Sequence, residues 1–191
     1  MKMLRIAIYA FAICLCAGPF FAAAAQDREP LNDNEIGELR EAAQEPLKRL
    51  RLYVSFSGSR LLDIDNLLDK NNVSDRGPQI HDLLQDFSTL IDEMDDNIDE
   101  YAKRGQDMRK ALPEVIKAET EYQTRLRTLQ QTAMNDPKAA QEYRAYNFAL
   151  QDAMESVRGS LEDAQKTLAD QIEQFKELEE KQKQEKKKKK Y

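Results

Sequence analysis

The side chains that most often carry out catalysis are scarce in this sequence. His81 is the only histidine, and both cysteines, Cys14 and Cys16, lie near the start of the chain. Nucleophilic catalysis and zinc sites need cysteine, histidine and acidic groups within reach of one another, and di-iron bundles need paired Glu-x-x-His motifs. The sequence has neither pattern, and it has no glycine-rich phosphate loop. We therefore expect a protein that is not an enzyme and that binds no cofactor.

Asp69, Asn71 and Asp75 have part of the spacing of a calcium-binding loop. The sixth position of that loop is Ser74, where glycine is required, and the twelfth is Ile80, where glutamate is required. Without these two residues the loop lacks its sharp bend and its bidentate ligand. The spacing therefore predicts an ordinary turn between two helices, without a bound metal.

A second acidic stretch contains six carboxylates between residues 92 and 100. Its members are Asp92, Glu93, Asp95, Asp96, Asp99 and Glu100. All six lie off the apolar positions described next, so we expect a solvated helix face. If two helices pair around the turn near residue 75, then Lys48, Arg49 and Arg51 lie opposite, and we expect them to match the stretch in charge.

The element that positions most of these residues is a long run with a 3.5-residue apolar period. The repeating positions are Ile80, Leu84, Phe87, Ile91, Met94, Ile98, Tyr101, Gly105, Met108, Leu112, Val115, Glu119, Tyr122, Leu126, Leu129 and Ala133. Only Gly105 and Glu119 are not apolar. A sustained period of this length predicts a long helix packed along a seam, as in a coiled coil.

The apolar pattern predicts three helices, which cover about residues 33–70, 78–134 and 137–180. Lys103, Arg104 and Gly105 together are typical of a helix end, so a four-helix bundle with a break near Gly105 is the alternative. The seam keeps its phase across this point and across Pro113, which favours one kinked helix. The expected fold is therefore all-α, an elongated antiparallel three-helix bundle or coiled coil.

Capping residues and prolines support these boundaries. Asn32 and Glu35 form a capping box at the start of the first helix, and Pro46 is expected to bend that helix. Pro78 and Pro137 suit the first positions of the second and third helices, because proline fits the first turn of a helix.

A continuous second helix would extend past the start of the first by about 20 residues, or roughly 30 Å. Only the third helix could cover this overhang, which spans about residues 116–153. Its aromatic residues are Tyr122, Tyr143, Tyr146 and Phe148. Phe148 lies off the seam, and exposed apolar patches often mark interfaces. We expect self-association or partner binding at this tip, with ordinary core packing as the alternative.

Charge is distributed unevenly along the chain. The sequence has 29 basic and 35 acidic residues. Without Lys2 and Arg5, which lie in the first 25 residues, the net charge is −8. Residues 181–191 carry +6, so residues 26–180 carry −14. An acidic body excludes a duplex-DNA binder, and no specific nucleic acid is expected. The basic end is expected to be disordered, as a solubilising tail or as a contact for an anionic envelope surface. The candidate contact residues are Lys186, Lys187, Lys188, Lys189 and Lys190.

The first residues have the layout of a cleavable secretory signal. A basic start is followed by an apolar run from Ile6 to Cys16 and by alanines at 22–25, so cleavage is expected after Ala25, with an uncleaved anchor as the alternative. This predicts a periplasmic or secreted protein with a flexible leader at residues 26–32. We expect an envelope structural protein or adaptor. The alternative is a chaperone-like or stress-response protein that binds unfolded clients, because the chain resembles helical periplasmic holdases in size, signal and charge.

Overall fold

The computed structural model describes residues 28–70, 73–135 and 139–188, and these residues form helices and connections without any strand. The helices are α1 (Asp33–Glu41), α2 (Pro46–Asp69), α3 (Arg76–Lys103), α4 (Leu112–Asn135) and α5 (Ala140–Lys188). The prediction of an all-α helical bundle is confirmed. The predicted signal peptide at 1–25 lies outside the described residues, as do the first two residues, 26 and 27, of the predicted flexible leader at 26–32.

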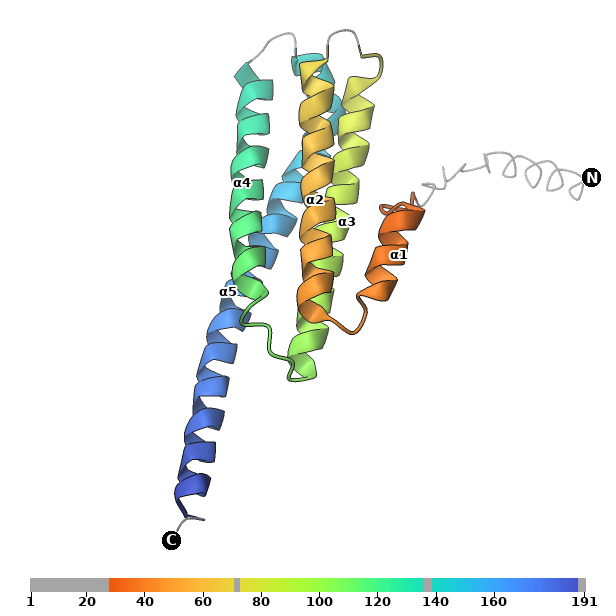
Figure 1. The fold of residues 1–191 in the computed structure, drawn as a ribbon. Coiled ribbons are helices and arrows are strands. Elements are labelled where there is room, and N and C mark those ends of the chain that lie inside the picture. Colours follow the sequence, from red (N-terminus) through yellow and green to blue (C-terminus); the bar gives the residue numbers. More distant parts are fainter. Residues whose placement is uncertain (1–27, 71–72, 136–138, 189–191) are drawn as a thin grey trace, which may run out of the picture.

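The four long helices run alternately up and down beside one another (Figure 1). α3 packs against α2 and α5, and α4 packs against α5 and α2, while the short α1 contacts α2. α5 is the longest helix, with 49 residues, or about 73 Å. Its first part belongs to the bundle, and its last turns continue well beyond it (Figure 1).

The single helix predicted at 78–134 is wrong, because the chain turns back between α3 and α4. Gly105 has φ +66, in the left-handed region that glycine adopts readily. Its N–H donates to the carbonyl of Ala102 at 2.9 Å, and the N–H of Gln106 donates to the carbonyl of Tyr101 at 3.0 Å. These two bonds make a Schellman motif, which ends a helix at glycine. Pro113 is then the second residue of α4 and kinks nothing.

A buried contact from α5 holds this turn in place. The side chain of Gln171 accepts a hydrogen bond from the N–H of Met108 at 2.9 Å and donates one to the carbonyl of Gln106 at 2.8 Å. Met108 itself is completely buried. The turn therefore contributes a core residue of its own, and the apolar period continues through it although the helix does not.

Replacing Gly105 with alanine should lower the free energy of unfolding by about 1–2 kcal/mol, since a Cβ is strained in the left-handed region. No atom lies within 4 Å of the added carbon, so crowding adds nothing to this cost. Gly159 also has open space around it but lies inside α5, where alanine favours the helix by roughly 0.5–1 kcal/mol. Urea unfolding of both variants should give effects of opposite sign. A stabilising effect of Gly105→Ala would contradict the glycine-terminated end of α3.

The first predicted helix, 33–70, is also divided. The capping box is confirmed, since the Asn32 side chain accepts from the N–H of Glu35 and the Glu35 side chain accepts from the N–H of Asn32. α1 nevertheless ends at Glu41, and Pro46 begins α2 instead of bending a longer helix. Proline suits this first position because it has no N–H to lose there.

Three further boundaries differ from the sequence prediction or lie outside the described residues. α3 begins at Arg76, two residues before Pro78. The predicted start at Pro137 lies outside the described residues, as do the last three residues of the chain. The end of the chain was expected to be disordered from residue 181, but α5 continues to Lys188.

Candidate functional site

The predicted aromatic tip does not form, because α4 folds back along α2 and leaves no overhang. The Tyr122 side chain is buried, and its hydroxyl donates to the carbonyl of Val54 on α2 at 2.5 Å. Tyr146 is also buried, and it packs edge-to-face on the half-buried Tyr143, with ring centroids 5.5 Å apart. Of the four predicted tip residues, only Phe148 is exposed, at 78%.

The acidic stretch of α3 does not pair with the basic residues of α2 in the predicted way. Within the described residues, Glu93 accepts a hydrogen bond from the hydroxyl of Tyr53 at 3.2 Å, and Arg49 donates to the same hydroxyl at 3.4 Å. Arg51 instead forms two hydrogen bonds of 2.7 Å with Glu114 on α4. The Tyr53 hydroxyl therefore bridges Arg49 and Glu93 between α2 and α3. The ion pair of Arg51 connects α2 to α4 instead.

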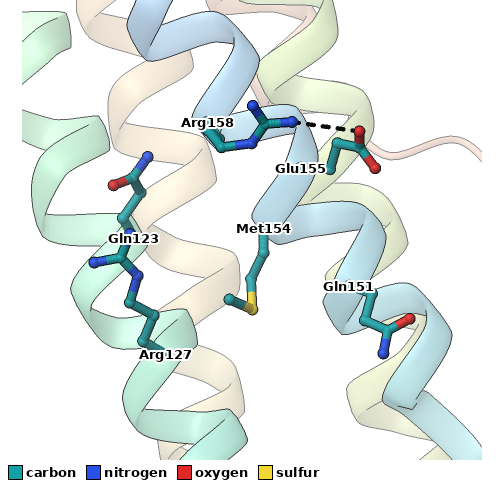
Figure 2. A pocket seen from close by; sticks show the side chains of 6 residues that line it. All are labelled: Gln123, Arg127, Gln151, Met154, Glu155 and Arg158. Atoms are coloured by element: carbon teal, nitrogen blue, oxygen red, sulfur yellow. Dashed lines mark hydrogen bonds and ion pairs between the residues drawn. The ribbon is translucent and has the colours of Figure 1, made fainter.

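A surface groove of about 280 Å³ lies between α4 and α5. Figure 2 shows its lining side chains, which are Gln123, Arg127, Gln151, Met154, Glu155 and Arg158. Arg158 is held at 3.4 Å from Glu155 and at 3.6 Å from Glu162, both on α5. Guanidinium and amide groups can donate hydrogen bonds to an acidic side chain of a binding partner. The lining contains no serine, cysteine or histidine. The groove therefore presents two guanidinium groups, two amides and the Glu155 carboxylate to the solvent.

The most exposed element is the last part of α5, residues 172–188, which we call the α5 arm. At its base the guanidinium of Arg109 lies 4.1 Å from the centroid of the Phe175 ring, and beyond that contact every described residue is exposed. Ile172 and Leu178 are exposed apolar residues on the arm. Its 17 residues span about 26 Å. The predicted contacts Lys186, Lys187 and Lys188 lie at its end and are exposed, while Lys189 and Lys190 lie outside the described residues.

Sequence reasoning missed an ion-pair network that fixes α1 and the residues before it. Arg60 on α2 donates to both carboxylate oxygens of Glu35, at 2.8 and 2.6 Å, and to the carbonyl of Pro30 at 2.7 Å. Arg28 pairs with Asp82 at 2.8 Å and also with Asp86 on α3. The 3.5-residue apolar period does not indicate such pairs, since their members are far apart in the sequence.

Sequence reasoning also missed the role of Glu119, although a polar residue at an apolar position is a visible signal. Glu119 was one of two exceptions to the apolar period, and it is completely buried. Its Oε1 accepts a hydrogen bond of 2.7 Å from Ser160 on α5, and its Oε2 has no partner among the described residues.

Residues 28–70, 73–135 and 139–188 contain neither of two common features, a cluster of metal ligands and a membrane-spanning helix. No group of three histidine, cysteine, aspartate or glutamate residues there could hold a metal ion. None of the helices there combines the length and the hydrophobicity that crossing a membrane requires.

The sequence matches no protein-family model, and neither a curated protein nor a solved structure is significantly similar to the chain.

Proposed function

We propose that this protein is a non-enzymatic adaptor of the cell envelope, exported by a signal at residues 1–25, which uses its helical body as a spacer and the α5 arm as its contact. The observation that carries the proposal is the exposed arm. A helix whose last 13 residues continue for about 20 Å beyond its contact at Phe175 costs conformational entropy without burying apolar surface there. Such an extension is consistent with a partner that contacts it.

The separation of charge supports the same function. Residues 26–180 carry −14 and residues 181–191 carry +6. At physiological ionic strength the Debye length is about 8 Å, and Lys186 lies 11 residues, or about 16 Å, beyond Phe175, which is roughly two Debye lengths. The lysines can therefore attract an anionic surface while the acidic body stays screened from it. A basic end placed directly against the body would be neutralised by the body's own carboxylates.

Neutralising the five consecutive lysines at the end of the chain tests this proposal. Changing Lys186–Lys190 to glutamine should lower the fraction of the protein that sediments with the envelope, and it should lower the salt concentration that releases the remainder. A control variant changes the same number of exposed lysines on the body. The control positions are Lys48, Lys70, Lys110, Lys117 and Lys166.

Each variant loses five positive charges, so the two variants differ only in where those charges lie. The control variant should be retained like the unmodified chain. Equal loss of retention in both variants would mean that net charge alone determines binding, and no loss in either would mean that the arm is not the contact. If the unmodified chain suppressed aggregation of a reduced model client, and did so equally without the lysines, the chaperone function would replace the adaptor.

A further inference from the structure

A carboxylate lies in the core where α4 meets α5. Glu119 is completely buried, and the hydroxyl of Ser160 donates to its Oε1 at 2.7 Å. Its other oxygen, Oε2, is buried without a hydrogen-bond partner in the described residues. An ionised carboxylate in that position would lose its hydration and regain a single hydrogen bond. The arrangement suits a protonated carboxyl group better than a charged one.

The titratable groups around the Glu119 carboxyl group are either acidic or uncharged. On α3, the charge of Asp95 acts on Glu119, and on α4 itself the charge of Glu119 acts on the buried Tyr122 hydroxyl. Asp95 is in turn surrounded by further carboxylates from two helices. These are Asp163 on α5 and Asp99, Asp96 and Asp92 on α3. No lysine or arginine is among the groups found to act on either Glu119 or Asp95 in the described residues.

Both carboxyl groups bind protons more tightly in the folded chain than in an unfolded one. Burial, with a smaller contribution from Asp95, raises the pKa of Glu119 from 4.5 to about 7, against the opposing hydrogen bond from Ser160. Burial and then the charge of Asp163 raise the pKa of Asp95 from 3.8 to about 6. The two groups therefore change charge between about pH 5 and pH 8.

We infer that Glu119 and Asp95 form a pH-dependent switch where α3, α4 and α5 meet. Protonation of the two groups stabilises the bundle in acid, and their ionisation weakens the packing of α4 at neutral and alkaline pH. The sign follows from proton linkage. A carboxyl group with a raised pKa in the folded state favours folding fully at low pH. That stability is lost as the pH rises through the folded values, because the folded chain must then give up protons that the unfolded chain has already released.

Other carboxylates act in the opposite direction, but at lower pH. Hydrogen bonds from Arg51 and Arg109 hold the pKa of Glu114 and of Asp107 below their usual ranges. Their contribution is present at neutral pH and is lost only as the pH falls toward about 4 and below. Asp86 and Asp92 act in the same direction as the switch residues, because burial raises the pKa of both.

Thermal unfolding of the full chain at pH 5 and pH 8 tests the switch. The unmodified chain should have a Tm higher at pH 5 than at pH 8 by at least about 5 °C, given 2–4 °C per kcal/mol for a chain of this size. Glu119→Gln replaces the carboxyl with a neutral group of the same shape. It should raise the Tm at pH 8 and remove much of the difference between the two pH values.

Two further variants make the result decisive. Glu121→Gln changes an exposed carboxylate on the same helix and should keep the full pH dependence. Asp95→Asn tests the second group if Glu119→Gln folds poorly, and it should also reduce the pH dependence. The switch is overturned if the unmodified chain is no more stable at pH 5 than at pH 8, or if both core variants keep the pH dependence of the unmodified chain.

Discussion

Replacing Arg60 with methionine is expected to lower the free energy of unfolding by about 3 kcal/mol, since removing one partner of a buried ion pair strands the other. The Arg60 and Glu35 side chains are only 11% and 10% exposed. Asp86, 4.0 Å from the Arg60 guanidinium, is equally enclosed. Methionine fills a similar volume but donates nothing, so Glu35 and the carbonyl of Pro30 both lose their partner. Urea unfolding measures the loss.

The direction of the Glu35 pKa shift agrees with a favourable Arg60–Glu35 pair in the folded chain. Burial raises the pKa of Glu35, but the hydrogen bonds from Arg60 and from the N–H of Asn32 more than offset it, so the pKa lies below its usual range. Arg51→Met removes the same kind of side chain from an exposed pair with Glu114 and should change stability little. Equal losses from Arg60→Met and Arg51→Met would contradict the buried network.

The loss of Arg60 should also release α1. Residues 42–45 connect α1 to α2, and α1 packs against α2 alone among the helices. Limited proteolysis of Arg60→Met should therefore cut the chain in this connection before it cuts the bundle. Cleavage elsewhere first would mean that the network supports the bundle in general and does not fasten α1.

Replacing Phe87 with alanine is expected to lower the free energy of unfolding by about 4 kcal/mol, the usual cost of removing a large aromatic side chain from a core. Phe87 on α3 is completely buried and packs edge-to-face on Tyr122 of α4, with ring centroids 5.5 Å apart. Phe148→Ala offers a matched control, because that side chain is exposed. It should change stability by no more than about 0.5 kcal/mol.

The same pair of rings tests the turn at Gly105. In one continuous helix Phe87 and Tyr122 would be about 52 Å apart, and mutations of the two would have additive effects. In the folded-back chain they touch, so a double-mutant cycle should give a coupling of about 0.5–1.5 kcal/mol. Additive effects within the error of denaturant unfolding would contradict the contact.

Much of the core could be predicted from the sequence, because a 3.5-residue period reports which side of a helix is buried. Ile80, Met94 and Leu126 are all at predicted seam positions and are all buried. The period does not report whether the helix continues. Here the turn supplies Met108 to the core in phase, so the pattern was uninterrupted although the chain reversed.

The decision between a continuous helix and a turn depends on a distant residue. Lys103, Arg104 and Gly105 gave the local signal for a helix end. The contact that fixes the turn comes from Gln171, which is 63 residues from Met108 and 65 from Gln106. A rule based on neighbouring residues does not include that contact, and the continuous apolar period therefore predicts one helix where the chain forms two.

The exposed and charged features were only partly predictable. The exposure of Phe148 and the lysine-rich end follow from local sequence. Glu119 was visible as an exception to the apolar period, but its lack of a cationic partner depends on which helices surround it. The contact of the Tyr122 hydroxyl with the carbonyl of Val54 likewise depends on α4 folding back along α2.

The most direct test of the account asks whether the α5 arm makes the contact in cells. A photo-reactive amino acid at Leu178 places the probe on the arm, and one at Gln165 places it on an exposed part of the same helix within the bundle. We predict that irradiation gives one discrete, stoichiometric adduct with an envelope component from Leu178 and none from Gln165. Identical adducts from both positions, or none from Leu178, would contradict the proposed role of the arm.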